Sequence, residues 1–334
     1  MNAKKFLFRV DAGGKTGLGH FYRSLHLAQE LKKRGHIIEF IHRPTDFWSQ
    51  QQRTGFPHVS FRSDNEHEET LAYLRKGKFD TFFVDGVLDF EEERFHEIKK
   101  LVNVVFYQNL SSSRFLADVF ILPSIHQTSD FFSVFNAGTK IFQGLEYFTF
   151  NQSIASLKVK NPNNLTEVRQ VGIISGGSDP ENALLRLYQR IDHARFFPIQ
   201  FTYFCGINYM HPSTIPVDYP QNVRFKSYDA KDIIHCSLLL SAFGVSTYEF
   251  MYLGMPILSF GHQPSNSFAS RVLAEKTGGI YHLGDISEIN SRTLNGQLSM
   301  FIGQRGKRLN LMENSKALLD LNGVRRVANI LENE

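Results

Sequence analysis

A repeated alternation of short apolar runs with segments of helical spacing is the feature that most constrains the fold of this chain. Residues 4–11 (KKFLFRVD) indicate a buried strand, and residues 19–35 then place Leu25, Ala28 and Leu31 on one face of a helix. Strand-like and helix-like segments continue to alternate up to the run NVVFYQN. This alternation predicts an α/β fold, a parallel sheet with helices on both faces.

A polar segment that contains the cluster NPNN (residues 161–164) interrupts the alternation, which then resumes with VGIISGG. Turn-forming residues of this kind are typical of an interdomain connection. We therefore predict two doubly wound, Rossmann-like domains, residues 1–150 and residues 169–334, joined by a linker over residues 151–168. Ligands of such sheets bind at the carboxyl ends of the strands, so we expect the two domains to face each other across a ligand-binding cleft.

Composition excludes several classes of protein. The 334 residues carry a formal net charge of +4 without a long Lys/Arg run, so no nucleic-acid partner is expected. Only two cysteines occur, which argues against a disulfide framework and favours a reducing compartment. The first residues, MNAKKFLFRVD, are too polar for a signal peptide, and no apolar run is long enough for a membrane helix. We expect a cytoplasmic protein without an integral membrane segment, whose oligomeric state the sequence does not indicate.

The first glycine loop, GGKTGLGHFYRS, joins the first predicted strand to its helix. Its glycines, which include Gly17 and Gly19, do not have the G-x-G-x-x-G spacing, and the Gly-Lys-Ser/Thr of a P-loop is missing. Free backbone N–H groups at the helix start, with Arg23 nearby, are suited to an anion. The same positive helix end favours a neutral His20, which is the state that a general base needs.

Two assignments in this loop remain open at the level of the residues. His20 is also compatible with a helix-capping or core histidine. Asp11, at the end of the first predicted strand, either orients His20 or makes a structural turn contact.

The second loop, ISGGSDPENALL, follows the first strand of the second alternation. Its residues Gly176, Gly177 and Ser178 can present N–H groups to a phosphate. The alternative is a tight turn in which Ser178 or Asp179 caps the next helix and no ligand is needed.

The third loop, SAFGVSTYEFMYLGMP, also joins a predicted strand to a helix. Gly244 and Ser246 would lie at the helix start, next to a phosphate. Glu249, one turn into the helix, is placed to accept hydrogen bonds from ribose hydroxyls, although a solvated glutamate is the simpler explanation for one carboxylate. Three such loops at the carboxyl ends of strands favour a nucleotide ligand. The chain shows no cluster of His, Cys, Asp and Glu at metal-ligand spacing, so we expect neither a metal nor another cofactor.

The chain resembles the UDP-sugar hydrolases of pseudaminic acid biosynthesis over nearly its whole length. The matching motifs are, in chain order, Arg9-x-Asp11, Gly17-Leu18-Gly19-His20-x-x-Arg23, Ser175-Gly176-Gly177-Ser178-Asp179, Ser241-Ala242-x-Gly244-x-x-x-x-Glu249 and Gly254-x-Pro256. These hydrolases are related to the glycosyltransferase of lipid II synthesis and share its GT-B fold. The ending LNGVRRVANIL is similar to the last helix of that family, which packs toward the first domain.

The resemblance implies that UDP and its sugar conjugate are the partners of this chain. UDP would lie on the second domain, with Gly176, Gly177, Ser178 and Ser246 near the phosphates and Glu249 at the ribose. His20 matches the catalytic histidine of the family. The implied reaction needs no metal and releases 2,4-diacetamido-2,4,6-trideoxy-L-altrose, or a related amino sugar, from its UDP derivative.

Three weaker positions are implied to contact the sugar: Asp85, Tyr147 and Asn266. The chain departs from the family around each of them, for example in Gly86-Val87 after Asp85, and also in Gln108-Asn109 after the next strand, where the hydrolases usually carry an Asp pair. The leading interpretation is a UDP-sugar hydrolase in which His20 activates water. The alternatives are a GT-B glycosyltransferase, in which an acceptor hydroxyl replaces water, and a nucleotide-sugar binding protein without turnover.

Overall fold

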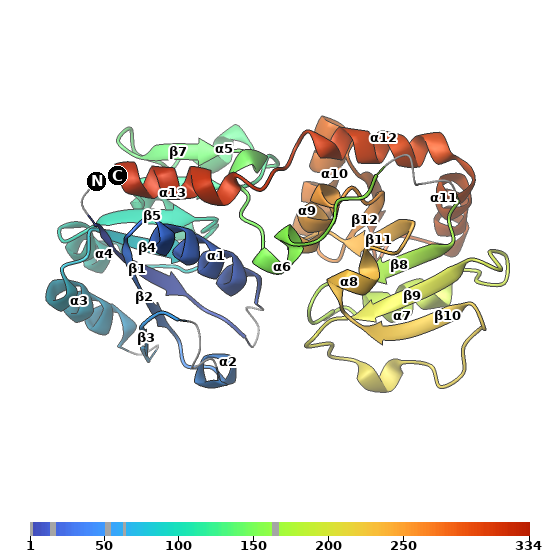
Figure 1. Ribbon diagram of the computed structural model, residues 1–334, viewed down its shortest axis with the longest axis horizontal. Helices are drawn as coiled ribbons and strands as arrows, with labels where there is room; N and C mark the ends of the chain where they lie inside the picture. Colours follow the sequence, from blue (N-terminus) through green and yellow to red (C-terminus); the bar gives the residue numbers. More distant parts are fainter. Residues whose placement is uncertain (1–2, 14–17, 51–54, 63–64, 162–166) are drawn as a thin grey trace. The chain divides into compact units, whose positions relative to one another are not determined.

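The computed structural model describes residues 3–13, 18–50, 55–62, 65–161 and 167–334 (Figure 1). The chain forms two compact units. The first, called the N-terminal unit, consists of Met1–Ala155 and Leu321–Glu334, and the second, the C-terminal unit, is Ser156–Asp320. Within the described ranges, no helix combines the length and the apolar character needed to cross a lipid bilayer.

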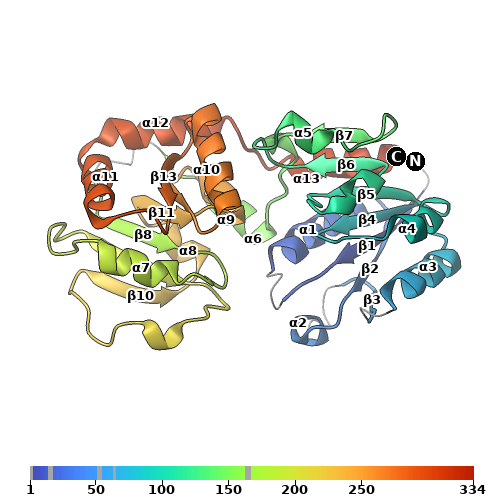
Figure 2. The same cartoon turned by 180° about the vertical axis from the view of Figure 1, so that it is seen from behind.

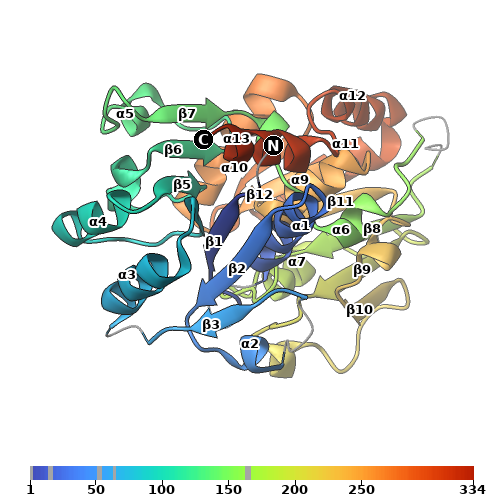
Figure 3. The same cartoon turned by 60° about the vertical axis from the view of Figure 1, so that its left-hand side comes forward.

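The N-terminal unit contains a seven-stranded sheet in the order β3-β2-β1-β4-β5-β6-β7, in which every neighbouring pair is parallel. Figure 3 shows β3 and β7 at opposite edges of this sheet. The register sets Phe8 on β1 opposite Phe40 on β2 and Phe83 on β4. The strands are β1 (Lys5–Val10), β2 (Ile37–His42), β3 (His58–Ser60), β4 (Thr81–Asp85), β5 (Asn103–Tyr107), β6 (Val119–Leu122) and β7 (Lys140–Gln143).

Helices cover both faces of this sheet because successive side chains of its strands are buried on opposite sides. Phe6 and Phe8 on β1 pack in the same core as α1 (Gly19–Lys33) and α13 (Gly323–Asn333). Leu7 packs in the core formed with α3 (Glu66–Gly77) and α4 (Glu92–Lys99), on the face seen in Figure 2. The short helices of this unit are α2 (Asp46–Gln50), η2 (Ser112–Leu116), α5 (Ser129–Phe132), η3 (Leu145–Tyr147) and α6 (Gln152–Ala155).

The last helix of the chain, α13, belongs to the N-terminal unit and packs on α1. Glu332 on α13 accepts a hydrogen bond from Arg34 Nη1 at 2.7 Å and contacts His36 Nε2 at 2.8 Å. At the start of α13, a side chain on Gly323 would collide with the Phe148 carbonyl, which lies 2.0 Å from the position of a Cβ atom. This close approach and the ion pair fix both ends of the helix.

The C-terminal unit contains a six-stranded parallel sheet in the order β10-β9-β8-β11-β12-β13. Its strands are β8 (Gln170–Ile174), β9 (Gln200–Cys205), β10 (Val223–Ser227), β11 (Leu238–Ala242), β12 (Ile257–Gly261) and β13 (Tyr281–Asp285). One face packs on α7 (Ala183–Arg190) and α11 (Ser291–Gly303). On the other face, Ser259 of β12 accepts a hydrogen bond from Ser270 of α10 (Pro264–Thr277). The remaining helices are η5 (Pro212–Thr214), α8 (Ala230–Ile233), α9 (Val245–Tyr252) and α12 (Arg305–Lys316).

Candidate functional site

Each sheet has a point where the strand order reverses, and the loops that leave its strands there separate to opposite sides. In the N-terminal unit this switch point lies between β1 and β4, and in the C-terminal unit between β8 and β11. The crevice at the carboxyl ends of such strands is the usual ligand site of an open α/β sheet. The three loops that the sequence singles out leave β1, β8 and β11, so each of them leaves a switch point.

His20 lies in the first turn of α1, at the switch point of the N-terminal unit. Its Nδ1 is 2.8 Å from Oδ1 of Asp85, the last residue of β4. The His20 side chain is 24% exposed, whereas that of Asp85 is 1% exposed. Gly86, which follows Asp85, has φ +132°, a conformation that L side chains rarely adopt, and a Cβ there would lie 3.9 Å from His20 Nδ1. The imidazole is therefore anchored through Nδ1 beside a glycine.

Asp85 is ionised although it is buried. Burial opposes its charge, but the nearby Arg23 guanidinium and, after it, His20 outweigh burial and hold the pKa of Asp85 well below its usual range. Ser24 also donates to Asp85 Oδ2 at 2.7 Å. These contacts keep the Asp85 carboxylate inside the protein, where it holds α1 and His20.

Arg23, which the sequence analysis predicts near a phosphate, is buried and bound to other side chains of the N-terminal unit. Its side chain is 4% exposed, and its Nε donates to Asp85 Oδ2 at 2.8 Å. Its Nη1 donates to Gln108 Oε1 at 2.6 Å, and its guanidinium lies 4.9 Å from the centroid of the Tyr107 ring. The burial of Arg23 follows from its place on the sheet-facing side of α1.

Asp11 makes a structural contact and does not orient His20. Its two carboxylate oxygens accept hydrogen bonds from Arg9 at 2.6 and 3.0 Å, and Oδ1 also accepts from the Arg43 backbone N–H at 2.8 Å. Burial raises the pKa of Asp11, but the hydrogen bond and charge of Arg9 more than offset this, so the pKa is lowered. The carboxylate that holds His20 is Asp85, on the neighbouring strand β4.

The other residues of the N-terminal unit that were predicted to belong to the site do not lie together in the structure. Gly19 starts α1, next to His20, whereas Gly17 lies outside the described residues. Tyr147 packs its ring on Phe142 with centroids 5.8 Å apart, beyond the edge strand β7. Only the backbone of Tyr147 reaches the His20 network, because its carbonyl accepts a hydrogen bond from Tyr107. The implied sugar contact of the Tyr147 ring has no support in this arrangement.

The loop after β8 turns its carbonyl groups toward the loop after β9. Gly177 O accepts from Asn208 N at 2.9 Å, and Ser178 O accepts from Met210 N at 3.0 Å. In a trans peptide the N–H points away from the preceding carbonyl, so the N–H groups of Ser178 and Asp179 point to the other side. Among the described residues, nothing accepts a hydrogen bond from the N–H of Gly177 or Ser178. Adjacent free amides are the type of donor that binds anions in proteins.

The start of α7, by contrast, is closed by a carboxylate of the protein. Asp179 Oδ1 accepts from Ala183 N at 2.7 Å, and Oδ2 accepts from Leu184 N at 3.0 Å. The first turn of α7 therefore does not offer these two amides to an external anion. A phosphate at this loop would bind the amides of Gly177 and Ser178 instead.

The loop after β11 supplies a second set of amides. Gly244 is the N-cap of α9, and no described atom lies within 4 Å of the place where its Cβ would be. The amides of Val245 and Ser246, in the first turn of α9, have no acceptor among the described residues. Asn266 Nδ2 donates to Phe243 O at 3.3 Å, which ties the start of α10 to this loop. Asn266 thus lies beside the loop that carries these amides.

Glu249 is a mostly buried residue whose carboxyl group lies near Tyr228. The residue is 8% exposed, and no described residue donates a hydrogen bond to its carboxyl oxygens. Burial raises the pKa of Glu249 to about 7. A carboxylate without a hydrogen-bond donor from the protein can accept hydrogen bonds from the hydroxyl groups of a ligand.

The sequence assigns no site role to two residues that the structure places at these loops, Ser175 and Gln108. Ser175 Oγ, at the end of β8, is buried without a hydrogen-bond partner among the described residues. In the sequence, Gln108 appears only as a departure from the family, yet it binds Arg23 and its backbone has φ +53°. The position of Gln108 directly after a strand was the available signal, because polar side chains at carboxyl ends of strands gather at one edge of a sheet.

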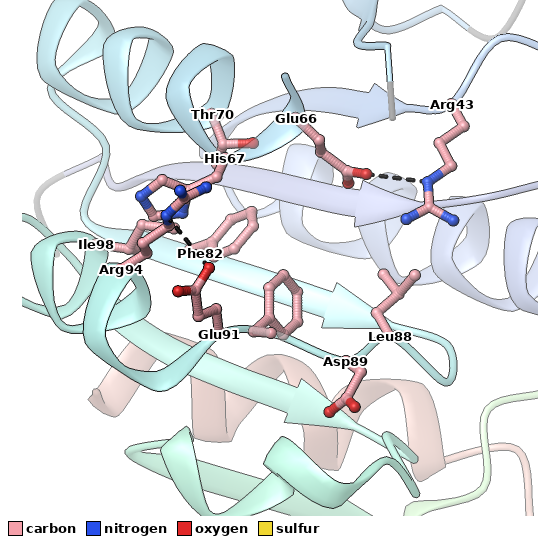
Figure 4. Close-up of a pocket in the computed structure, with 11 residues that line it drawn as sticks. Arg43, Glu66, His67, Thr70, Phe82, Leu88, Asp89, Glu91, Arg94 and Ile98 are labelled. Carbon is pink, nitrogen blue, oxygen red and sulfur yellow. Dashed lines mark hydrogen bonds and ion pairs between the residues drawn. The ribbon is translucent and has the colours of Figure 1, made fainter. Parts of the chain in front are cut away.

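A pocket of about 170 Å³ opens on the α3 and α4 side of the N-terminal sheet (Figure 4). Phe82 and Ile98 are buried in its wall, and Arg43 pairs with Glu66 at 2.9 Å. Asp85 and His20 belong to the other face, because Phe82 and Val84 of β4 pack toward α3 and α4 whereas Asp85 faces α1. The pocket is therefore separate from the His20 site. The described residues contain no group of three or more His, Cys, Asp and Glu placed to hold a metal ion.

Comparisons with known proteins define the class of fold. No family model matches the chain. The chain is 21% identical over 337 residues to the spore coat polysaccharide biosynthesis protein SpsG of Bacillus subtilis strain 168, and the match covers 97% of this chain and 96% of SpsG.

Two solved structures are similar over almost the entire chain. The glycotransferase of kitacinnamycin has a TM-score of 0.70 at 14% identity, covering 100% of this chain and 99% of its own. The S. aureus MnaA–UDP co-structure has a TM-score of 0.67 at 12% identity, covering 98% of this chain and 96% of its own. Together with the two parallel sheets, these likenesses show a GT-B glycosyltransferase-like fold, and this part of the sequence prediction is confirmed.

Proposed function

We propose that this protein is a nucleotide-sugar enzyme that binds a UDP-sugar through the C-terminal unit and hydrolyses it with His20 as general base. The observation that carries the proposal is Glu249, a mostly buried residue whose carboxyl group accepts no hydrogen bond from the described residues and which lies on the same helix as free amides. The UDP in the MnaA co-structure and the polysaccharide biosynthesis in the name of SpsG support the same substrate class.

The C-terminal unit would bind UDP through three kinds of contact. The amides of Gly177 and Ser178 and those at the start of α9 would donate to the diphosphate oxygens. The Glu249 carboxylate would accept hydrogen bonds from the ribose hydroxyls. The same amides would stabilise the charge that grows on the diphosphate as it leaves.

The N-terminal unit would supply the base. His20 removes a proton from water, the water oxygen bonds to the anomeric carbon, and the bond from that carbon to the diphosphate oxygen breaks. The electron pair of the broken bond leaves on UDP, and the proton stays on His20 until solvent removes it. Asp85 touches His20 and not the reacting atoms in this scheme. Following the resemblance to the pseudaminic acid hydrolases, we propose a diacetamido-trideoxy hexose as the sugar.

A glycosyltransferase is the second candidate, and two apolar side chains favour it. Val87 and Leu110 follow β4 and β5 at the edge that carries Asp85, and they are 63% and 38% exposed. Exposed apolar side chains beside a polar site suit an acceptor with an apolar body. In this reaction His20 would deprotonate an acceptor hydroxyl in place of water.

Incubation of the protein with UDP-sugars, with and without acceptor alcohols, separates these functions. A hydrolase releases UDP and free sugar without an acceptor, and the His20→Asn protein does so far more slowly. Glycoside formed only with an acceptor would replace the hydrolase with a transferase. UDP-sugar binding without any turnover would leave a binding protein.

A further inference from the structure

We propose that Asp85 and Arg23 are positioning residues that hold His20 in the tautomer with its proton on Nδ1, so that Nε2 carries the lone pair. The inference rests on the proposed function only in giving that lone pair the task of accepting a proton from water. The tautomer itself follows from contacts within the N-terminal unit.

Nδ1 of His20 has two neighbours that demand opposite tautomers. Asp85 Oδ1, at 2.8 Å, can only accept, and therefore requires a proton on Nδ1. Arg23 Nη2, at 2.7 Å, can only donate, and therefore requires a bare Nδ1 and a proton on Nε2. With a bare Nδ1 the proton sits on Nε2, and the one lone pair of the ring then points at Asp85 and Arg23 instead of standing on Nε2.

The directions of the N–H bonds favour Asp85 as the partner. Asp85 Oδ1, His20 Nδ1 and Arg23 Nη2 are all within hydrogen-bonding distance of one another, so they form a nearly equilateral triangle with angles of roughly 60°. The two N–H bonds of one guanidinium nitrogen diverge by about 120° in the plane of the group. Nη2 therefore cannot point one proton straight at Asp85 and the other straight at His20.

Arg23 is already committed to Asp85. Its Nε donates to Oδ2 at 2.8 Å and its Nη2 to Oδ1, the side-on pairing in which two parallel N–H bonds meet one carboxylate. Its Nη1 donates to Gln108 Oε1 at 2.6 Å, which fixes the guanidinium from the other side. One proton of Nη2 thus bonds to Asp85 Oδ1. Nη2 lies close to His20 Nδ1 because both nitrogens contact the same carboxylate oxygen.

The acceptor sites of Asp85 lead to the same tautomer. Each carboxylate oxygen accepts about two hydrogen bonds. Oδ2 receives two, from Arg23 Nε and from Ser24 Oγ at 2.7 Å. Oδ1 receives one from Arg23 Nη2, and its second site faces His20 Nδ1. A proton on Nδ1 completes the set, whereas a bare Nδ1 would place a lone pair against an anionic oxygen.

Gln108 is the residue that secures Arg23 in this arrangement. Its φ of +53° is rare for a residue other than glycine, and its N–H donates to Ile121 O at 2.8 Å. This backbone geometry brings its side-chain oxygen to Arg23 Nη1 at the end of β5. The network His20–Asp85–Arg23–Gln108 thus joins α1 to the ends of two neighbouring strands.

Nitrogen-15 NMR of histidine-labelled protein at about pH 8, where unperturbed imidazoles are neutral, tests the tautomer directly. The spectrum of His20→Asn identifies the His20 signals by their absence. We expect Nδ1 to show the shift of a protonated nitrogen and Nε2 that of a bare one. The reverse pattern, with the proton on Nε2, would overturn the inference without any variant of Asp85 or Arg23.

A pair of variants then tests which carboxylate sets the tautomer. Asp85→Asn removes the negative charge and leaves the Arg23 cation beside Nδ1, so the population should move toward the Nε2–H tautomer and sugar release should fall by about 10²–10⁴. Asp11→Asn is the matched control, because Asp11 is also paired with a buried arginine at the end of a neighbouring strand. It should leave the His20 tautomer unchanged, and a shift in this variant but not in Asp85→Asn would contradict the assignment.

The two proposals fail in different ways. If the protein transfers sugar to an alcohol, or binds without turnover, the hydrolase proposal is wrong while the NMR result stands. If the protein hydrolyses its substrate with the proton of His20 on Nε2, the positioning roles of Asp85 and Arg23 are wrong while the hydrolase remains.

Discussion

Glu249 shows how burial can prepare a single residue for a ligand. A carboxyl group that is 8% exposed and has no donor among the described residues is costly to ionise, which is why its pKa is raised to about 7. A ligand whose hydroxyls donate to it would lower that cost. If UDP binds here as proposed, the residue links that binding to pH, and it gives two predictions.

The first prediction concerns affinity. Ribose hydroxyls bind the ionised form, so a UDP-sugar should release a proton from Glu249 below pH about 7, and its affinity should fall by up to tenfold for each pH unit below that value. Calorimetry in buffers of different ionisation enthalpy measures the proton release. Glu249→Gln should bind about 1.5–3 kcal/mol more weakly and lose the pH dependence. Equal affinity of wild type and Glu249→Gln at pH about 8 would remove Glu249 from the ribose site.

The second prediction concerns stability. The pKa of Glu249 is raised in the folded state from its ordinary value of 4.5, so folding is favoured most when the carboxyl is protonated. The free energy of unfolding should therefore decrease as pH rises from about 4.5 to about 7, by an amount on the order of 2–4 kcal/mol. Glu249→Gln should flatten this part of the profile, which urea unfolding at several pH values would reveal. An unchanged slope in the variant would show that another group is responsible.

At the scale of elements, the loop after β8 depends on two supports. A Cβ on Gly206 would lie 2.3 Å from both the Gly176 and the Gly177 carbonyl oxygen, too close for either backbone to stay in place. Gly206→Ala should therefore displace the loop and weaken UDP binding at least tenfold. Gly296→Ala, in α11 with open space around it, is the control and should leave affinity unchanged. Normal UDP affinity in a folded Gly206→Ala protein would mean that this loop does not bind UDP.

The second support is the cap of α7. Asp179→Ala should lower the free energy of unfolding by about 0.5–2 kcal/mol, because two amides of the first turn lose their acceptor. It should also weaken UDP binding, since Asp179 adjoins Ser178. The control is Asn290→Ala, which removes the N-cap of α11, where Asn290 Oδ1 accepts from Thr293 N. This variant should lose a similar amount of stability without a change in UDP affinity. Equal effects of both variants on UDP affinity would show that the cap acts only on stability.

The sequence predicts a strand or a helix well where neighbouring residues alone form the pattern. The strand predicted over residues 4–11 is β1, and the helix predicted to begin near Gly19 is α1. The roles of Arg23 and Asp85 could not be predicted from the sequence. The two residues are 62 positions apart and come together only when β4 pairs with β1. Spacing along α1 places Arg23 near His20, but it cannot show that the side chain is buried against another strand.

In the whole molecule, the two units have the same architecture but carry different functional groups. Both units are parallel sheets with a switch point, and both place their candidate residues at the carboxyl ends of the strands beside it. The N-terminal unit provides an imidazole held by a carboxylate, whereas the C-terminal unit provides free amides and a buried carboxyl group. We therefore propose that the N-terminal unit carries catalysis and the C-terminal unit binds the nucleotide.

Measurement of the rate of sugar release and of UDP affinity on the same His20→Asn protein tests this division most directly. We expect the His20→Asn protein to have a melting temperature within a few degrees of wild type and a UDP affinity close to that of wild type. Its rate of sugar release should be lower by about 10²–10⁴. A folded His20→Asn protein that releases sugar at nearly the wild-type rate would contradict the account.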